Sequence, residues 1–222
     1  MHSHVLPEFF YSASYGGDKQ QFVSISRHPH HPTRRFQKGY RERRLCQGCE
    51  SLLSRYETAS AKTLRNILAL APDEQKVIAA EYDSPSFRLF GLSILWRMHV
   101  STLFQFQKVD LGPHAEEIRQ LLNEEDPKNP VMYPFFLMRV TGSKSAERTI
   151  IAPVPFKISG RKGYVLLAMG FNWIFCVSSD CAGLERQLPF VGTTEYLLVP
   201  VRFETDSHFL SQLAALTSRW GK

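Results

Sequence analysis

The amino-acid sequence has 222 residues, of which 43% are hydrophobic and 22% are charged. This composition excludes a wholly disordered or fibrous protein, and the length suits one large domain or two small ones. The sequence lacks both the run of about twenty uncharged apolar residues that a membrane span requires and a recognisable secretory signal. Four cysteines are too few for a disulfide framework, so we expect a cytoplasmic protein.

The positive charge is concentrated in the first third of the chain. The formal net charge is +6, and residues 1–65, with eleven Lys and Arg against five Asp and Glu, account for all of it. Most of the excess lies in a basic block that also contains Phe36 and Tyr40, and its cations are Arg27, Arg34, Arg35, Lys38, Arg41, Arg43 and Arg44. Such a block is typical of a nucleic-acid-binding surface. A basic but merely solvated loop is the alternative.

The first half of the chain predicts two long helices. Residues 1–44 are irregular, apart from an alternating piece at 21–25 that predicts a strand. Apolar residues recur at helical spacing over 50–70. Residues 87–106 are apolar on most faces and predict a central buried helix, with Arg97 as a buried ion-pair partner.

The second half changes from helix to strand. Gly112-Pro113 opens a shorter helix that Asp126-Pro127 ends. Stretches rich in β-branched and aromatic residues then predict strands at 131–140, 149–158, 164–177 and 196–203. Residues 160–163 suit a hairpin connection, and Ser207 suits the N-cap of a closing helix. Cys176 and Cys181 are interpreted as core or loop cysteines.

Cys46 and Cys49 form the most specific local motif. Their C-x-x-C spacing at the start of a predicted helix lets a tight turn direct both thiolates at one ion, which predicts half of a structural zinc site. The complementary ligands are to be sought among the histidines at positions 2, 4, 28, 30 and 31. A redox pair and two buried free thiols are the alternatives.

Two separated motifs resemble the HNH (ββα-metal, treble-clef) endonucleases. That family has a His-aliphatic-aliphatic-Pro strand, a loop, and a cysteine knuckle leading into a helix. Here Ser3-His4-Val5-Leu6-Pro7 is similar to the strand, and Cys46-Gln47-Gly48-Cys49-Glu50 is similar to the knuckle. SHVLPEFFY and RLCQGCESLLSRYE look more narrowly like an uncharacterised bacterial group of HNH-related proteins. The resemblance covers about residues 1–60.

The resemblance implies a reaction and its residues. His4 matches the general base that takes a proton from the attacking water, while Mg²⁺ or Mn²⁺ neutralises the leaving oxygen of a phosphodiester. Cys46 and Cys49 match the second zinc knuckle, to which His2 would add a ligand. Glu50 stands where the family often has Asn or His. Like Glu57, it could supply an oxygen ligand or be a helix-surface carboxylate. No C-x-x-C precedes His4 in this sequence, so we expect an incomplete zinc site.

We therefore expect an α+β protein with three regions. These are a treble-clef-like basic module at 1–62, a helical region at 63–128, and a β-rich region with a closing helix at 129–222. Two functions fit this organisation: a metal-dependent endonuclease, which is a hydrolase, or a non-catalytic treble clef that binds nucleic acid or a protein partner. A homo-oligomer is compatible with either, and no membrane partner is expected. Fold-level analogy suggests bacterial defence against foreign DNA.

Overall fold

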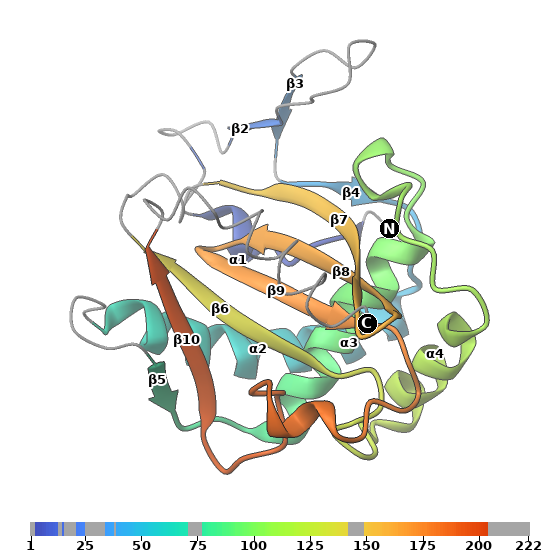
Figure 1. Ribbon diagram of the computed structural model, residues 1–222. Helices are drawn as coiled ribbons and strands as arrows, with labels where there is room; N and C mark the ends of the chain where they lie inside the picture. The colour runs from blue at the N-terminus through green and yellow to red at the C-terminus, as the bar shows by residue number, and fades with distance from the viewer. Residues whose placement is uncertain are drawn as a thin grey trace.

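The computed structural model describes residues 3–12, 15, 21–24, 34–37, 39–70, 77–141 and 149–203. Within these ranges the protein has the expected α+β class, with helices packed against one face of a six-stranded mixed sheet (Figure 1). None of the helices in the described ranges has the length and apolar character needed to cross a membrane.

The sheet is built mainly from antiparallel hairpins. Its strands, in spatial order, are β5 (Val77–Ala80), β10 (Leu197–Phe203), β6 (Phe135–Thr141), β9 (Phe171–Cys176), β8 (Arg161–Ala168) and β7 (Ile151–Ile158). Only the β10–β6 pair among them is parallel. The four predicted strand stretches are thereby confirmed, with one division, and β5 is an additional strand.

Two tight turns correct the expected strand boundaries. The predicted strand at 164–177 is two strands, because Met169 and Gly170 have positive φ angles of 55° and 74° and reverse the chain. Likewise β7 and β8 are joined by Ser159 and Gly160 alone, with φ angles of 47° and 77°, rather than by residues 160–163. Positive φ at both central positions is the type I′ geometry that matches strand twist.

The helices are α1 (Glu8–Tyr11), α2 (Gln47–Ala69), α3 (Ser84–Val100) and α4 (His114–Glu124), with short 3₁₀ turns η3 (Phe104–Phe106) and η4 (Leu184–Arg186). The three longer helices confirm the apolar periodicity of the sequence, whereas α1 lies in the segment expected to be irregular. The expected helix at 87–106 begins earlier, where Asp83 caps it by accepting from the Ser86 N–H. It ends earlier as well, because Ser101 takes an extended conformation.

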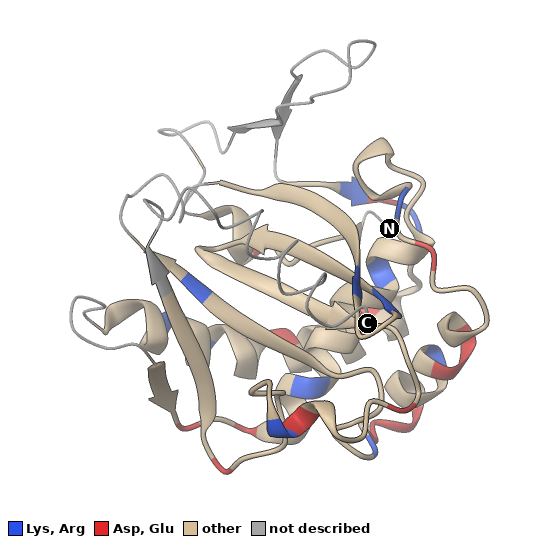
Figure 2. Ribbon diagram, in the orientation of Figure 1, with Lys and Arg blue, Asp and Glu red and all other residues tan. Residues whose placement is uncertain are grey.

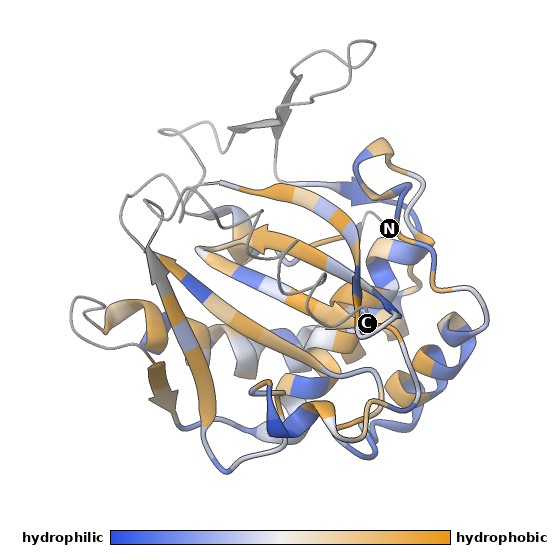
Figure 3. Cartoon of the chain, in the orientation of Figure 1, coloured by the Kyte–Doolittle hydropathy of each residue, from blue (hydrophilic) through white to orange (hydrophobic). Residues whose placement is uncertain are grey.

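The main core lies between the sheet and α3. Trp173 of β9 is fully buried and stacks with Phe87 of α3 at a ring-centroid distance of 6.2 Å. Gly91 permits this close approach of helix to sheet, since a Cβ there would lie 2.1 Å from Cζ of Phe135. Figure 3 shows apolar residues along the central strands that face this layer. The core thus depends on aromatic side chains that a helix and a sheet contribute together.

The N-terminal residues belong to the same core. Leu6, Phe10 and Tyr11 have no exposed surface, and the Phe10 ring lies 5.3 Å from the Trp173 ring. Here β1 (Ser3–His4) pairs with β4 (Arg41–Glu42), and β2 (Gln21–Ser24) pairs with β3 (Arg34–Gln37). The strand expected at 21–25 is therefore confirmed. Segments from all three expected regions contribute to one hydrophobic cluster.

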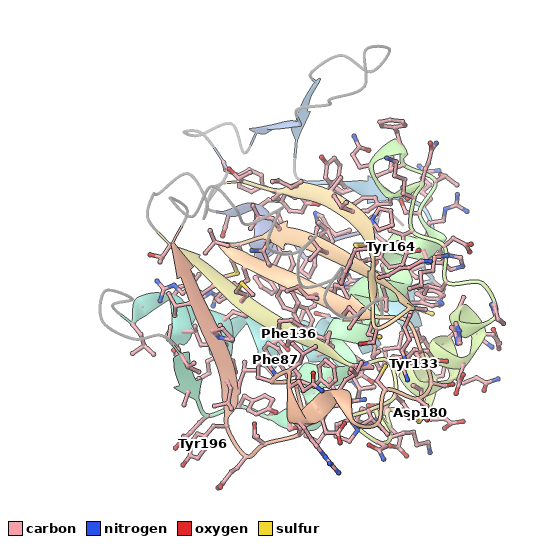
Figure 4. The ribbon with its side chains drawn as sticks, in the orientation of Figure 1. Phe87, Tyr133, Phe136, Tyr164, Asp180 and Tyr196 are labelled. Carbon is pink, nitrogen blue, oxygen red and sulfur yellow. The ribbon has the colours of Figure 1, made fainter. Side chains whose placement is uncertain are left out.

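The other face of the sheet carries a smaller cluster. Phe136 of β6 packs there with Phe190 of the loop after η4, their rings 6.2 Å apart. Figure 4 labels Phe136 together with Phe87, which belongs to the opposite face. Cys176 and Cys181 are buried in this cluster with their Sγ atoms 3.2 Å apart, as expected of core cysteines. The predicted closing helix lies outside the described residues.

Candidate nucleic-acid interface

His4 lies on a very short strand that the core anchors. Its aliphatic neighbours Val5 and Leu6 are buried, whereas the His4 side chain is half-buried. His4 is opposite Arg41 in the antiparallel β1–β4 pair. The next pair is joined by a hydrogen bond from Val5 N to the Tyr40 carbonyl, at 2.9 Å. The aliphatic residues of the His-aliphatic-aliphatic-Pro segment therefore fix the histidine at the margin of the core.

The basic block is described only in part. Arg41, Arg43 and Arg44 are exposed in and just after β4, which carries the colour of basic residues in Figure 2. Arg34 and Arg35 belong to β3, while Arg27 and Lys38 lie outside the described residues. Three of the predicted phosphate-contacting residues therefore lie beside the histidine strand.

Glu42, the single acid of the basic block, points into the protein. Its carboxylate accepts hydrogen bonds from the hydroxyl of Ser101 and from the N–H (3.1 Å) and hydroxyl (2.5 Å) of Thr102. Burial alone would raise the pKa of Glu42, but these hydrogen bonds outweigh it and lower the pKa below its usual range. Glu42 therefore joins β4 to the end of α3. Strand alternation along Arg41-Glu42-Arg43 is the sequence signal for this inward position.

The two cysteines lie together at the N-terminus of α2. Cys46 is the N-cap, and its Sγ accepts a hydrogen bond from Cys49 N at 3.3 Å. The two Sγ atoms are 3.2 Å apart. The backbone N–H of Cys49, followed by its thiol, lowers the pKa of Cys46, and the same hydrogen bond to Cys46 raises the pKa of Cys49. Cys46 therefore has the lower pKa of the pair, at the positive end of a helix.

The cysteine pair has the donor chemistry of half a zinc site. Two sulfurs bonded to one tetrahedral zinc at about 2.3 Å lie roughly 3.8 Å apart, so the pair would need to open only slightly. Within the described ranges, however, no three His, Cys, Asp or Glu side chains are grouped closely enough to hold a metal ion. His2, the expected further ligand, lies outside those ranges. The described residues therefore fit zinc as two of its four ligands.

Glu50 and Glu57 have different environments on α2. Oε1 of Glu50 is shielded from solvent and has no hydrogen-bond partner among the residues that the structure describes. Glu57 pairs with the buried Arg97 of α3, its Oε1 2.7 Å from Arg97 Nη1. The prediction of a buried ion pair for Arg97 is confirmed, and Glu57 is its partner. Glu50 therefore has the carboxylate oxygen that remains without a protein partner.

A small depression brings part of the predicted site together. It is lined by residues of β1, β4 and α3, namely Ser3, His4, Val5, Glu42, Arg44, Leu45, Arg97 and Val100. Leu45 immediately precedes Cys46, so the depression leads from His4 to the start of α2. Sequence reasoning identified His4, Arg44 and Arg97 here but missed Glu42, whose partners lie far along the chain.

Comparisons with protein-family models, curated proteins and solved structures returned no match to this chain.

Proposed function

We propose that the chain is a nucleic-acid-binding protein related to the HNH endonucleases, with a strand–strand–helix module as its binding site. One observation carries the proposal. The His4 strand pairs antiparallel with β4, and β4 leads directly into a helix that begins at the C-x-x-C motif. This order of strand, strand and helix, formed by sequence motifs more than forty positions apart, supports the proposal.

The binding step rests on positive charge. Arg41, Arg43 and Arg44 are exposed beside His4, and the N-terminus of α2 adds a partial positive charge. Guanidinium groups match the geometry of phosphate oxygens and bind them through paired hydrogen bonds. The remaining cations of the basic block would extend this contact along the backbone. For duplex DNA, the logarithm of the binding constant falls linearly with the logarithm of the salt concentration, and each phosphate contact makes this slope steeper by about 0.9.

The hydrolytic step assigns His4 the role of general base. Histidine is the side chain that most often takes a proton from a reacting group in enzymes. A divalent ion, when bound, would neutralise charge on the phosphate, and Glu50 would supply a carboxylate oxygen to it. Cys46 and Cys49 would hold structural zinc, with His2 as a further ligand. The thiols must stay reduced for this role, so the proposal includes a cytoplasmic location.

A second candidate is a non-catalytic binding module. It is favoured by two carboxylates of the site, because Glu42 is bonded to Ser101 and Thr102 and Glu57 is paired with Arg97. Neither carboxylate is available to a catalytic metal without losing those partners. In this candidate the basic surface binds nucleic acid, and the histidine serves binding or structure.

A nicking assay with a binding arm separates the two candidates. Supercoiled plasmid is incubated with Mg²⁺ or Mn²⁺ and either wild type or His4→Ala, with DNA affinity measured across a salt series. If the protein is a nuclease, we expect wild type to nick the plasmid and His4→Ala to nick it at a rate at least about 100-fold lower. Salt-sensitive binding without nicking would favour the binding module. Equal nicking by both proteins would contradict the role of His4, and absence of binding would contradict both candidates.

A further inference from the structure

The peptide unit that follows His4 is held from two opposite sides. Its N–H, which belongs to Val5, donates to the Tyr40 carbonyl at 2.9 Å. In an antiparallel ladder, pairs that exchange backbone hydrogen bonds alternate with pairs that do not. Val5 and Tyr40 form a hydrogen-bonded pair, so the adjacent His4–Arg41 pair is a non-hydrogen-bonded one. The carbonyl of His4 therefore points away from β4.

Arg97 binds that carbonyl from the other side. Its Nη1 donates to the His4 carbonyl oxygen at 3.3 Å and to Oε1 of Glu57 at 2.7 Å. The same guanidinium donates to Ser93 of its own helix, through Nε to the carbonyl and through Nη2 to the hydroxyl, both at 3.3 Å. The Arg97 side chain is only 5% exposed. One planar group therefore connects β1, α2 and α3.

We propose that Arg97, held in place by Glu57, is the positioning residue for His4. A peptide unit is planar, so fixing both its carbonyl and its N–H fixes the plane and the backbone angle ψ of His4. That angle sets the direction in which the imidazole leaves the strand. The support is needed because β1 has two residues and pairs with only two residues of β4. Arg97 occupies the place that a third strand would otherwise fill.

The proposal is specific for arginine at this position. The guanidinium donates from three nitrogens in a fixed plane, and the nitrogen that binds His4 also binds Glu57. Lysine has one nitrogen and cannot span the same acceptors. Replacing Glu57 with glutamine keeps the size of the side chain but removes the counter-charge that holds the guanidinium. Both substitutions should therefore release the His4 peptide unit.

The test uses NMR of the histidine side chains in the full chain. The His4 imidazole signal is identified by its loss in His4→Asn and then followed in Arg97→Lys and Glu57→Gln. Arg88→Lys is the matched control. Arg88 is equally buried in α3, but it donates to carbonyls of Pro127, Asn129, Pro130, Met132 and Val191, away from His4. We expect the first two variants to shift or broaden the His4 signal and the control to leave it unchanged.

The outcomes separate this inference from the proposed function on which it rests. If wild type nicks DNA, Arg97→Lys should lower kcat about 10- to 100-fold with KM unchanged. If wild type does not nick, the nuclease proposal fails while the His4 signal still decides the role of Arg97. The inference would be overturned if the His4 signal in Arg97→Lys and Glu57→Gln were the same as in wild type. It would also be overturned if Arg88→Lys changed the His4 signal as much as those two variants do. If Arg97→Lys fails to fold, the His4 signal in Glu57→Gln alone decides whether Arg97 positions His4.

Discussion

Two buried arginines of α3 illustrate how single residues organise this molecule. Arg97 has a carboxylate partner, whereas Arg88, 2% exposed, is bonded only to backbone carbonyls in the described structure. Burial lowers the pKa of Arg88 to about 10, so the guanidinium remains charged at neutral pH. Its carbonyl partners before β6 and near Val191 lie on segments without helix or strand structure. Arg88 therefore donates hydrogen bonds to backbone carbonyls that have no helix or strand partner.

Removing the Arg88 guanidinium should destabilise the fold. Arg88→Met keeps a long apolar stem but leaves several buried carbonyls without a donor. We expect the free energy of unfolding to fall by about 3 kcal/mol, as measured by urea denaturation. Arg119→Met is the control, because Arg119 is exposed on α4 and its ion pair with Glu116 lies on the surface of the same helix. A loss in Arg88→Met no larger than in the control would contradict this role.

The two arginines also show where sequence reasoning succeeds at this scale. A charge between apolar residues of a buried helix predicts an ion pair, and Arg97 has one. The partner of Arg88 was not predictable, because it is a set of carbonyls whose position depends on the folded loop. Glu42 was missed for the same reason, since Ser101 and Thr102 reach it only after α3 has packed.

At the scale of elements, the junction between β4 and α3 controls where the central helix ends. The Glu42 carboxylate binds Thr102 N and the hydroxyls of Ser101 and Thr102, which hold the chain in the extended turn after Val100. Apolar periodicity alone extended this helix to residue 106. Periodicity predicted the helices and the strand stretches, whereas turns made by Met169 or Ser159 carry little sequence signal because neither residue favours positive φ.

This junction predicts a dependence of stability on pH. The pKa of Glu42 is lower in the folded protein than its ordinary value of about 4.3. The carboxylate therefore contributes its full stabilisation above that pH, and the contribution is lost as the pH falls through the folded pKa. Glu42→Gln should lower the free energy of unfolding at pH 7 by about 1 to 3 kcal/mol. Its difference from wild type should shrink below about pH 4.

Denaturation curves from pH 3 to pH 7 measure this difference. Glu81→Gln serves as the matched control, because Glu81 is exposed and has no hydrogen bond or ion pair among the described residues. A constant difference between Glu42→Gln and wild type across the range would show that the Glu42 carboxylate does not carry the effect.

At the scale of the whole molecule, the candidate site and the sheet share one core. Phe10 lies between the histidine strand and the sheet, in contact with Phe90 of α3 and Trp173 of β9. The sequence indicated a basic N-terminal part, a helical middle and a β-rich end. It carried no signal for their packing, because contacts between residues as distant as Phe10 and Trp173 leave no local pattern.

The shared core predicts cooperative unfolding. Phe10→Ala removes a fully buried ring and should lower the free energy of unfolding by about 3 to 5 kcal/mol. Because the ring contacts Trp173, tryptophan fluorescence and far-UV circular dichroism should report one coincident transition in wild type and variant. Phe104→Ala, at an exposed phenylalanine, should change stability little. Separate transitions for the two probes would indicate that the N-terminal part unfolds independently.

The contact between Phe10 and Trp173 also has a consequence for the order of events on the ribosome. The chain is made from its N-terminus, so Phe10 is synthesised long before β9, whose Trp173 packs against it. The His4 carbonyl cannot accept the hydrogen bond from Arg97 until α3 has been made. The helix α3 in turn cannot pack fully until β6 and β9 have formed the part of the sheet that it covers. A nascent chain therefore carries the histidine and the arginines without the geometry that brings them together. Any activity of this site begins only after β9 has been synthesised.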